Sequence, residues 1–303
     1  MAVSAKMVKD LREQTGVGMM DCKKALEETG GDMEAAVDWL RKKGLSSASK
    51  KAGRVAADGK VVAVVEGTQG LLLEVNTETD FTSKNENFVA FAETSARLGL
   101  QSGVTDVEQL KTLGYPETGR SVADELTQKI ATIGENMNLR RLVRLQVTQG
   151  VVVPYIHMEG KIGVLVGLES ASTDGAGLAS LGKKLAMHVA ASAPPWLNRT
   201  AVPAEAVERE RAILAEQARS SGKPESIIDK MVAGRLDKFY GESCLLEQPF
   251  VMDPDQKVND VVVAQAKAMG TTITVSGFVR YVLGEGIQKK EEDFAAEVAK
   301  AAG

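Results

Sequence analysis

The chain contains 303 residues, and its 37 Lys and Arg against 41 Asp and Glu give a net charge of −4. This length allows about two domains with a full hydrophobic core. The chain has only seven Phe, four Tyr and two Trp. The acidic balance and the few aromatic rings disfavour direct binding to nucleic acid, which needs a basic surface and stacking side chains.

Cysteine usage and hydropathy indicate a cytoplasmic protein. Cys22 and Cys244 are far apart without a C-x-x-C pair, so neither a disulfide framework nor a thiolate metal site is expected. Residues 1–6 lack the apolar region of a signal peptide, and no run approaches the roughly 18 apolar residues of a membrane span. We therefore expect no membrane association, no metal and no cofactor.

Residues 1–44 predict a helical domain of three short helices. Ser4 and Asp32 are typical N-cap residues, and the third helix is expected to end at Gly44. Residues 45–54 are small and basic without a sustained apolar face. They predict a linker, with a partly helical linker as the alternative.

Residues 55–150 predict the first of two core subdomains. Short apolar runs at 61–65 and 71–75, separated by a tight turn, indicate two strands. Ser83 begins a capping-box pattern that predicts a helix over 83–99.

A second helix and a strand are expected later in this subdomain. Ser121 begins the predicted helix, which Gly134 closes. In the strand that follows, Val143, Leu145 and Val147 occupy alternate positions.

Phe81 lies two residues before the cap predicted at Ser83, where the helix offers it no obvious intramolecular place. One interpretation is that the ring folds back into the core, as most aromatic side chains do. The other is that the ring is an exposed anchor of the kind that dominates binding interfaces. For Asp80, the simpler interpretation is a carboxylate that only stabilises the helix dipole.

Residues 151–195 and 246–285 predict a second core subdomain that repeats the order of strand, turn, strand and helix. Its expected elements are strands at 151–157, 162–168, 271–275 and 278–283, a helix through Leu178 and Val189, and a helix at 258–269. The expected fold class is therefore α+β, with two related subdomains.

Residues 196–245 predict an antiparallel helical hairpin, with helices at 203–219 and 225–241. Residues 286–303 predict a C-terminal helical module in which Phe294 and Val298 have i,i+4 spacing. Two apolar residues bury little surface, so this helix must dock on something or fray.

No motif in the chain supports a catalytic site. Residues 177–184 match G-x-x-x-x-G-K, but Lys184 stands where a Ser or Thr should hold magnesium. The leucines of this segment fit an amphipathic helix better than a phosphate loop. Gly16 and Gly18 lack the preceding strand and the third glycine of a dinucleotide-binding motif.

The two histidines exclude a three-histidine metal site, and neither H-E-x-x-H nor G-x-S-x-G occurs. His188 falls one step from the apolar stripe of its helix, which predicts a satisfied, partly buried histidine. His157 falls at a strand end, where we expect it to be exposed.

Five segments in order along the chain resemble the bacterial elongation factor Ts family. They are TGVGMMDCKKAL at 15–26, TDF at 79–81, IGEN at 133–136, MHVAAS at 187–192 and DFAAEV at 293–298. The resemblance implies a nucleotide-exchange factor, not an enzyme, that binds the GDP form of the GTPase elongation factor Tu and promotes GDP release so that GTP can rebind. It also implies a ubiquitin-associated-like domain at 1–44, two related core subdomains, a protruding hairpin and a C-terminal helix on the partner.

The same resemblance implies which residues contact the partner. The turn of Thr79, Asp80, Phe81 and Thr82 would enter the G domain of elongation factor Tu, where the ring would wedge between elements that support magnesium and the phosphates. The further implied contacts are Lys23, Lys51, Ile133, Gly134, His157, Phe294 and Val298. Residues 82–83 and 193–196 depart from the commonest family pattern, so no contact is carried over to 193–196.

Two rival interpretations remain open. A phosphate-handling enzyme would centre on residues 177–184 and would bind nucleotide itself. A helical adaptor or RNA-binding protein would be built around residues 1–54. Loss of all partner binding when residues 1–54 are removed would support the adaptor. Acceleration of GDP release only from an added GTPase would favour exchange over both.

Overall fold

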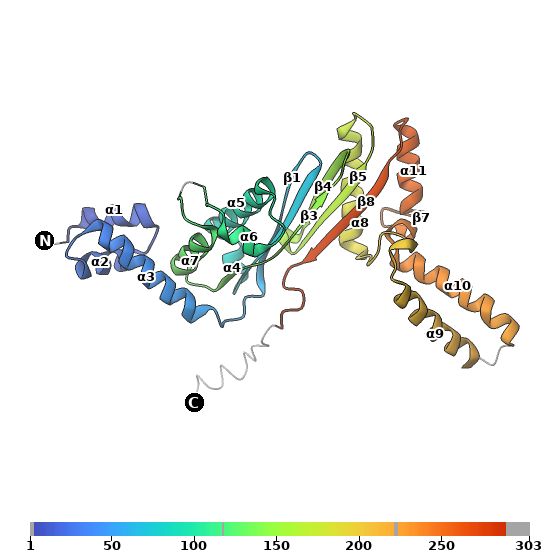
Figure 1. The fold of residues 1–303 in the computed structure, drawn as a ribbon, viewed down its shortest axis with the longest axis horizontal. Helices are drawn as coiled ribbons and strands as arrows, with labels where there is room; N and C mark the ends of the chain where they lie inside the picture. The colour runs from blue at the N-terminus through green and yellow to red at the C-terminus, as the bar shows by residue number, and fades with distance from the viewer. Residues whose placement is uncertain (1–2, 117, 221–223, 289–303) are drawn as a thin grey trace.

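The computed structural model describes residues 3–116, 118–220 and 224–288, which form an elongated molecule (Figure 1). A small helical module lies at one end, two sheets lie in the middle and a helical hairpin projects at the other end. Helices and small antiparallel sheets are mixed along the chain, in agreement with the predicted α+β class. None of the described helices is long and apolar enough to cross a membrane.

Three helices form the N-terminal module: α1 (Ala5–Thr15), α2 (Met19–Glu28) and α3 (Met33–Lys51). Ser4 and Asp32 cap α1 and α3 as predicted, because their side chains accept hydrogen bonds from the N–H groups of Met7 and Ala35. The helices pack through a small buried core that contains Val8, Leu11, Val17, Cys22, Leu26 and Leu40.

The predicted end of α3 at Gly44 was wrong, because the helix continues to Lys51. Gly44 lies where α3 meets helix α7 (Val122–Ile133), and a Cβ at this position would be 3.4 Å from the Cβ of Ala131. The glycine therefore permits a close approach of two helices rather than ending one. Most of the linker expected at 45–54 is helix, and its Ala48 packs on the core of the first sheet.

Polar contacts also join the N-terminal module to α7. Gln128 Nε2 donates a 3.0 Å hydrogen bond to the carbonyl oxygen of Thr15. Arg41 Nη2 lies 3.4 Å from Asp124 Oδ1. These contacts hold the module against the core on the side of α3.

The first sheet contains β1 (Asp58–Glu66), β2 (Gln69–Thr77) and β3 (Met137–Gln146), antiparallel in the order β1-β2-β3. The strands predicted at 61–65 and 71–75 are the centres of β1 and β2. Helices α5 (Glu86–Ser102), α6 (Val107–Thr112) and α7 pack on this sheet. The core between them includes Leu71, Leu73, Val75, Phe88, Phe91, Leu126 and Leu139.

The helix predicted over 83–99 begins later than expected. Ser83 ends a separate short helix, α4 (Asp80–Ser83), and its Oγ donates to the carbonyl oxygen of Asp80 at 2.6 Å. Asn85 caps α5 instead, and its Oδ1 accepts hydrogen bonds from two N–H groups of the first turn, the closer at 2.9 Å. The predicted cap at Ser83 was therefore wrong, because a side chain placed to satisfy two N–H groups sets the helix start.

Helix α7 agrees with the prediction. Ser121 Oγ accepts a 3.0 Å hydrogen bond from the N–H of Asp124. Gly134 follows the helix with φ 92°, in the left-handed region that favours glycine. The chain therefore turns sharply just before Glu135.

The second sheet contains β4 (Gly150–His157), β5 (Ile162–Glu169) and β8 (Thr274–Val282) in the order β4-β5-β8. The separate strands predicted at 271–275 and 278–283 were wrong, because β8 is continuous. Its pairing skips Ser276, so that Gly167 pairs with Gly277 and Leu168 with Val275. A bulge of this kind leaves one residue unpaired, and the pairing continues on both sides of it.

Helices α8 (Gly175–Ser192) and α11 (Val258–Ala268) pack with the second sheet around a buried core. That core includes Val164, Val166, Leu168, Leu181, Leu185, Val189 and Val262.

Helices α9 (Ala204–Ser220) and α10 (Glu225–Ser243) run side by side as the projecting hairpin (Figure 1). Their apolar seam consists of Leu214, Ala218, Ile228, Val232 and Leu236. The short elements that join the hairpin to the core are η2 (Arg199–Ala201), η3 (Leu245–Glu247), β6 (Pro249–Phe250) and β7 (Asp253–Lys257). The C-terminal helix expected to carry Phe294 and Val298 lies outside the described residues.

The two sheets meet through an apolar contact and a buried charge cluster. The apolar contact includes Val61, Leu72, Val147, Val152 and Leu165. The fully buried Glu74 of β2 lies 2.9 Å from Arg140 Nη1 and 2.6 Å from Arg141 Nε of β3. Burial raises the pKa of Glu74, but hydrogen bonds from the N–H of Gly284 and from both arginines outweigh this effect and lower the pKa below its usual value.

Candidate functional site

The turn between β2 and α5 presents Phe81 to solvent. Thr79 caps the four-residue helix α4, because its Oγ1 accepts a 3.3 Å hydrogen bond from the N–H of Thr82. Thr82 and Ser83 are buried, whereas 83% of Phe81 is exposed. The interpretation in which this ring folds back into the core was therefore wrong.

Asp80 lies beside Phe81 and is also exposed. Its Oδ2 is 4.0 Å from Lys84 Nζ, and both side chains are more than half exposed. An ion pair of this geometry contributes little to stability. The carboxylate is therefore accessible to a binding partner.

Glu135 holds the turn with both of its carboxylate oxygens. Oε2 accepts hydrogen bonds from Thr77 Oγ1 at 2.8 Å, from the N–H of Glu78 at 3.1 Å and from the N–H of Thr79 at 3.0 Å. Oε1 accepts from Thr79 Oγ1 at 2.6 Å. Burial raises the pKa of Glu135, but hydrogen bonds from the surrounding threonines outweigh this effect and lower the pKa below its usual value.

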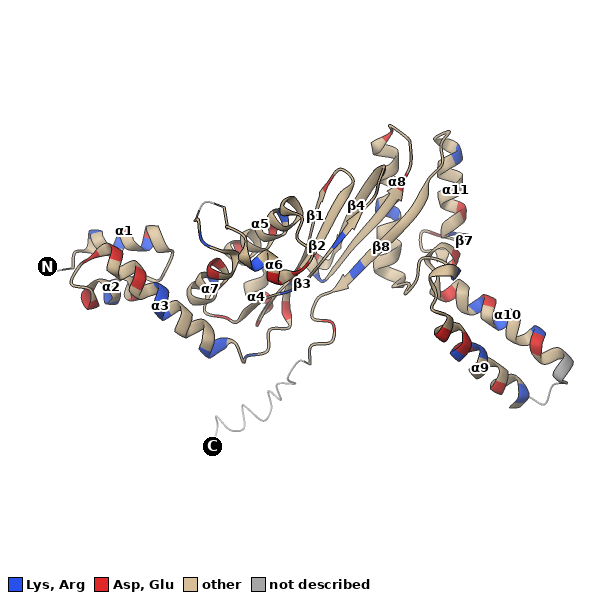
Figure 2. Ribbon diagram, viewed as in Figure 1, with Lys and Arg blue, Asp and Glu red and all other residues tan. Residues whose placement is uncertain are grey.

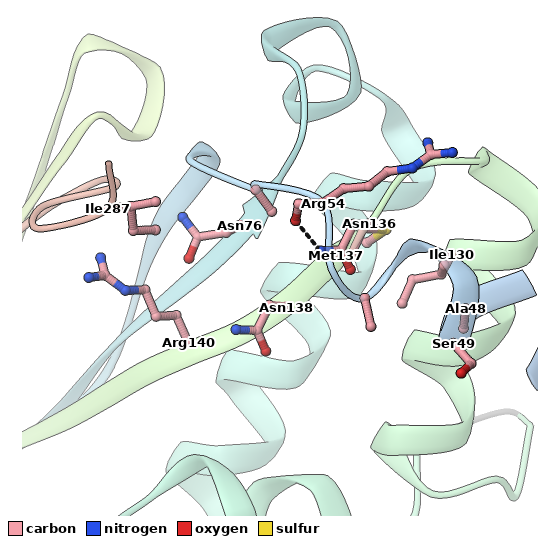
Figure 3. A pocket seen from close by; sticks show the side chains of 12 residues that line it. Ala48, Ser49, Arg54, Asn76, Ile130, Asn136, Met137, Asn138, Arg140 and Ile287 are labelled. Atoms are coloured by element: carbon pink, nitrogen blue, oxygen red, sulfur yellow. Dashed lines mark hydrogen bonds between the residues drawn. The ribbon is translucent and has the colours of Figure 1, made fainter. Parts of the chain in front are cut away.

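A second contact runs in the opposite direction, because the loop that carries Glu135 also donates to the turn. Glu78 Oε1 accepts a 2.5 Å hydrogen bond from the N–H of Asn136 and lies 3.5 Å from Arg54 Nη1. Asn136 Nδ2 donates to the carbonyl oxygen of Arg54 at 2.7 Å, a bond that Figure 3 shows at the edge of a cavity of about 630 Å³. Three chain segments therefore meet at the base of the turn.

Ile133 and Gly134 directly precede Glu135, so the structure brings these two predicted contact residues beside the predicted turn. Ile133 is half-buried at the end of α7, and Gly134 is exposed. The bonds of Glu135 to Thr77 and Thr79 fix the two segments relative to each other.

His157 ends β4 and is exposed, as predicted. Its Nδ1 lies 3.0 Å from the hydroxyl of Tyr155. The turn that follows, η1 (Met158–Gly160), leads to Lys161, whose Nζ lies 2.8 Å from Asp58 Oδ1. Because Asp58 pairs with Thr77, the β4–β5 turn reaches the same end of the first sheet as the Phe81 turn.

The predicted contacts Lys23 and Lys51 do not join this cluster. Lys23 Nζ lies 3.7 Å from Glu27 Oε1 on α2. Lys51 Nζ donates to Ser47 Oγ at 2.7 Å on α3. Within the described residues, both lysines bond inside their own helices, and Phe294 and Val298 lie beyond those residues.

The rival phosphate-loop interpretation was wrong. Residues 177–184 lie inside α8, and Asp174 caps that helix by accepting a 2.9 Å hydrogen bond from the N–H of Gly177. A phosphate cradle needs free N–H groups in a non-helical loop, and here a carboxylate already occupies the helix start.

His188 is satisfied, as predicted, although it is fully rather than partly buried. Its Nε2 lies 2.8 Å from Gln248 Oε1, and its Nδ1 accepts a 3.1 Å hydrogen bond from the N–H of Val251. In the part of the chain that the structure describes, no group of three or more His, Cys, Asp or Glu side chains could hold a metal ion.

The charge distribution does not favour the RNA-binding interpretation. Figure 2 shows both acidic and basic residues along α1 to α3 and along α9 and α10. Nucleic-acid binding usually needs a clustered basic face. These mixed helix faces are typical of solvated surfaces.

Glu78, Glu135 and Asn136 are site residues that the sequence did not predict. Glu135 and Asn136 belong to the IGEN segment, yet their partners lie more than 50 positions earlier in the chain. The one local feature that marks Glu135 in the sequence is its position directly after Gly134, the glycine that ends α7.

The exposed aromatic turn, held by partly buried hydrogen bonds beside the first sheet, has the features of a protein-binding site rather than of a catalytic site. Residues 78–285 match the family model described as Elongation factor TS. The chain is 64% identical over 300 residues to Elongation factor Ts of Magnetococcus marinus, with 99% of each chain covered. It is 54% identical over 299 residues to Elongation factor Ts of Syntrophotalea carbinolica and 56% identical over 306 residues to that of Rhodospirillum centenum, again with 99% coverage of each chain. The chain belongs to the elongation factor Ts family.

Proposed function

We propose that this chain is the guanine-nucleotide exchange factor of elongation factor Tu in the cytoplasm. It binds the GDP form of this GTPase, inserts the turn of Asp80 and Phe81, and promotes GDP release so that GTP can rebind. The observation that carries the proposal is the 83% exposure of Phe81 on a turn whose backbone is anchored by Glu135. An aromatic side chain that the fold itself does not bury is suited to insertion into a partner.

The chain acts without a catalytic group of its own. A GTPase retains GDP through magnesium and through N–H groups around the phosphates. Insertion of a ring and a carboxylate beside these elements distorts them and weakens nucleotide binding. By linkage, the nucleotide weakens binding of the exchange factor by the same factor, so the cycle is reversible.

The energy of one ring sets a limit on the role of Phe81. Accelerating GDP release about 1,000-fold requires about 4 kcal/mol of preferential stabilisation of the opened complex. Burial of one aromatic ring provides about 1.5 to 3 kcal/mol. The remainder must come from a wider interface, whose binding energy holds the GTPase in its opened form.

That interface extends over several parts of the chain. The turn of Thr79 to Thr82 is joined by Ile133, Gly134 and His157. The remaining proposed contacts are Lys23, Lys51, Phe294 and Val298.

We also propose a division of the chain into domains. It consists of a ubiquitin-associated-like domain at 1–44, a connector at 45–54, core subdomains at 55–150 and at 151–195 with 246–285, the hairpin at 196–245 and a C-terminal module at 286–303.

The test measures release of labelled GDP from purified elongation factor Tu with and without the chain. The chain should accelerate release strongly and should not bind GDP by itself. Direct GDP binding by the isolated chain, or unchanged release from the GTPase, would rule the proposal out.

A further inference from the structure

We propose that Glu135 is a positioning residue that holds the Phe81 turn in the conformation in which it inserts. The inference rests on the proposed exchange function and adds a residue that acts through the turn rather than on the partner. It assigns the carboxylate a role beyond ordinary stabilisation of the fold.

The first argument is the direction of its hydrogen bonds. Four bonds of Glu135 go to Thr77, Glu78 and Thr79, the three residues that lead into α4, and its carboxylate also interacts with the side chain of Thr82 within that helix. Two of the donors are backbone N–H groups at the exit of β2. The carboxylate therefore fixes the path of the chain at the point where it leaves the sheet.

The second argument is that one hydroxyl group, that of Thr79, links Glu135 to the start of α4. Thr79 Oγ1 donates to Glu135 Oε1 at 2.6 Å and accepts from the N–H of Thr82 at 3.3 Å. The same oxygen thus connects the carboxylate to the cap of α4. A helix of four residues has too few internal bonds to be stable alone, so its cap and anchor decide whether it forms.

The third argument is that the anchor is reciprocal. The N–H of Asn136 donates to Glu78 Oε1, while Glu135 accepts from the N–H of Glu78. Asn136 is in turn bonded to the carbonyl oxygen of Arg54, as Figure 3 shows. The loop after α7 and the Phe81 turn therefore move as one unit, and this loop carries the proposed contacts Ile133 and Gly134.

The chemistry of the site requires a carboxylate rather than an amide. Four donors converge on two oxygens, and a carboxylate accepts at both. In Glu135→Gln, one oxygen becomes an NH₂ group that faces donors and has nothing to accept it. The substitution keeps the size of the side chain and breaks at least one bond, so it tests the anchor with little change in packing.

The experiment is a double-mutant cycle on GDP release from elongation factor Tu, with the full chain, Glu135→Gln, Phe81→Ala and the double variant. We expect Glu135→Gln alone to slow release about tenfold, because one charge-assisted hydrogen bond of this strength corresponds to roughly a factor of ten. In the Phe81→Ala background the same change should cost clearly less than tenfold, because most of its effect passes through the ring and only the remainder through Asp80 and the loop of Gly134. Equal factors in both backgrounds, or no effect in either, would overturn the proposal.

A matched control separates positioning from stability. Glu125 is a buried carboxylate on α7 with Arg120 Nη1 at 2.9 Å and Lys129 Nζ at 3.2 Å, and it makes no described bond to the turn. Glu125→Gln should lower the melting temperature at least as much as Glu135→Gln while GDP release stays near the original rate. If Glu125→Gln slows release in proportion to its loss of stability, Glu135 has only a structural role.

A second measurement does not depend on nucleotide exchange. Hydrogen–deuterium exchange of the free chain should become faster at the amides of Glu78, Thr79 and Thr82 in Glu135→Gln, and unchanged protection there would overturn the anchor. If the unaltered chain fails to accelerate GDP release, the proposed function falls, and this measurement still decides whether Glu135 holds the turn. If Glu135→Gln does not fold, Glu135→Asp, one methylene shorter, takes its place in both assays.

Discussion

The N–H of Gly284 donates a 2.8 Å hydrogen bond to Glu74 Oε1, so the segment that follows β8 is tied to the middle of the first sheet. The same oxygen lies 2.9 Å from Arg140 Nη1. Arg141 bonds the other oxygen and also donates to the carbonyl oxygen of Val282 at the end of β8. One buried carboxylate thus connects the first sheet to the end of the second, in addition to the apolar contact between them.

Glu74→Ala is expected to lower the free energy of unfolding by about 2 to 3 kcal/mol, because it removes the buried acceptor shared by the partly buried Arg140 and Arg141 and by the N–H of Gly284. Urea unfolding followed by circular dichroism measures this loss. As a control, Glu242→Ala removes an exposed carboxylate 3.6 Å from Lys238 Nζ and should change stability by less than about 1 kcal/mol. Similar losses in the two variants would contradict the role given to Glu74.

Phe81→Ala is expected to slow the stimulated release of GDP by about 10- to 100-fold, which corresponds to the burial of one ring in the partner. Its melting temperature should stay nearly unchanged, because the ring is 83% exposed in the free chain. Phe91→Ala is the matched control, since this ring is fully buried and its removal should cost about 3 to 5 kcal/mol of stability. A large stability loss in Phe81→Ala would show that the ring belongs to the core.

Asp80→Ala is expected to weaken the complex with elongation factor Tu, because the exposed carboxylate is one of the groups that the turn offers to the partner. Isothermal titration calorimetry at low ionic strength measures the dissociation constant. Lys84→Ala removes the neighbour of Asp80 at 4.0 Å and serves as the control for its intramolecular ion pair. An unchanged dissociation constant in Asp80→Ala would remove this residue from the interface.

His188 should make stability depend on pH. Burial lowers the pKa of His188, although the hydrogen bond to Gln248 opposes this effect. Because the folded pKa lies below the unfolded value of 6.5, the stabilising contribution is complete above that pH and is lost as the pH falls toward the folded value. Unfolding free energy should therefore fall as the pH is lowered from about 7.5 to about 5.5.

Replacing each histidine in turn shows which of them causes the dependence of stability on pH. The chain has only two histidines, and His157 is exposed. His157→Gln should keep the dependence on pH, whereas His188→Gln should remove most of it. A slope that survives in His188→Gln would mean that other groups titrate in this range.

Local patterns predicted most of the secondary structure. The helix from Ser121 to Gly134 was predicted at both ends, because a hydroxyl cap and a left-handed glycine act through neighbouring atoms. Gly44 is a glycine, the residue type that commonly ends a helix, but it lies inside α3 where this helix contacts Ala131. No local sequence pattern indicates that contact. Ser83 failed as a cap for a related reason, since Asn85 competes for the same helix start.

The candidate site also contains residues that the sequence could indicate and a residue that it could not. Phe81 could be singled out because its register left it without an obvious place in the helix, and Asp80 because it forms an acidic-aromatic pair with Phe81. Glu135 could not, because its partners Thr77 and Thr79 come close only when β2 and β3 pair and α7 ends beside them. The proposed partner contacts are visible in the local sequence pattern, whereas the proposed anchor Glu135 depends on the tertiary fold.

Helix α3 has a consequence for how a partner is recognised. It is a single helix of 19 residues, about 28 Å long, that runs without a break from the N-terminal module to the core and lies against α7. The N-terminal module and the core are therefore joined by one continuous helix. A partner that contacts both the module and the core, as proposed above, must therefore present its two binding spots at the spacing that this helix sets.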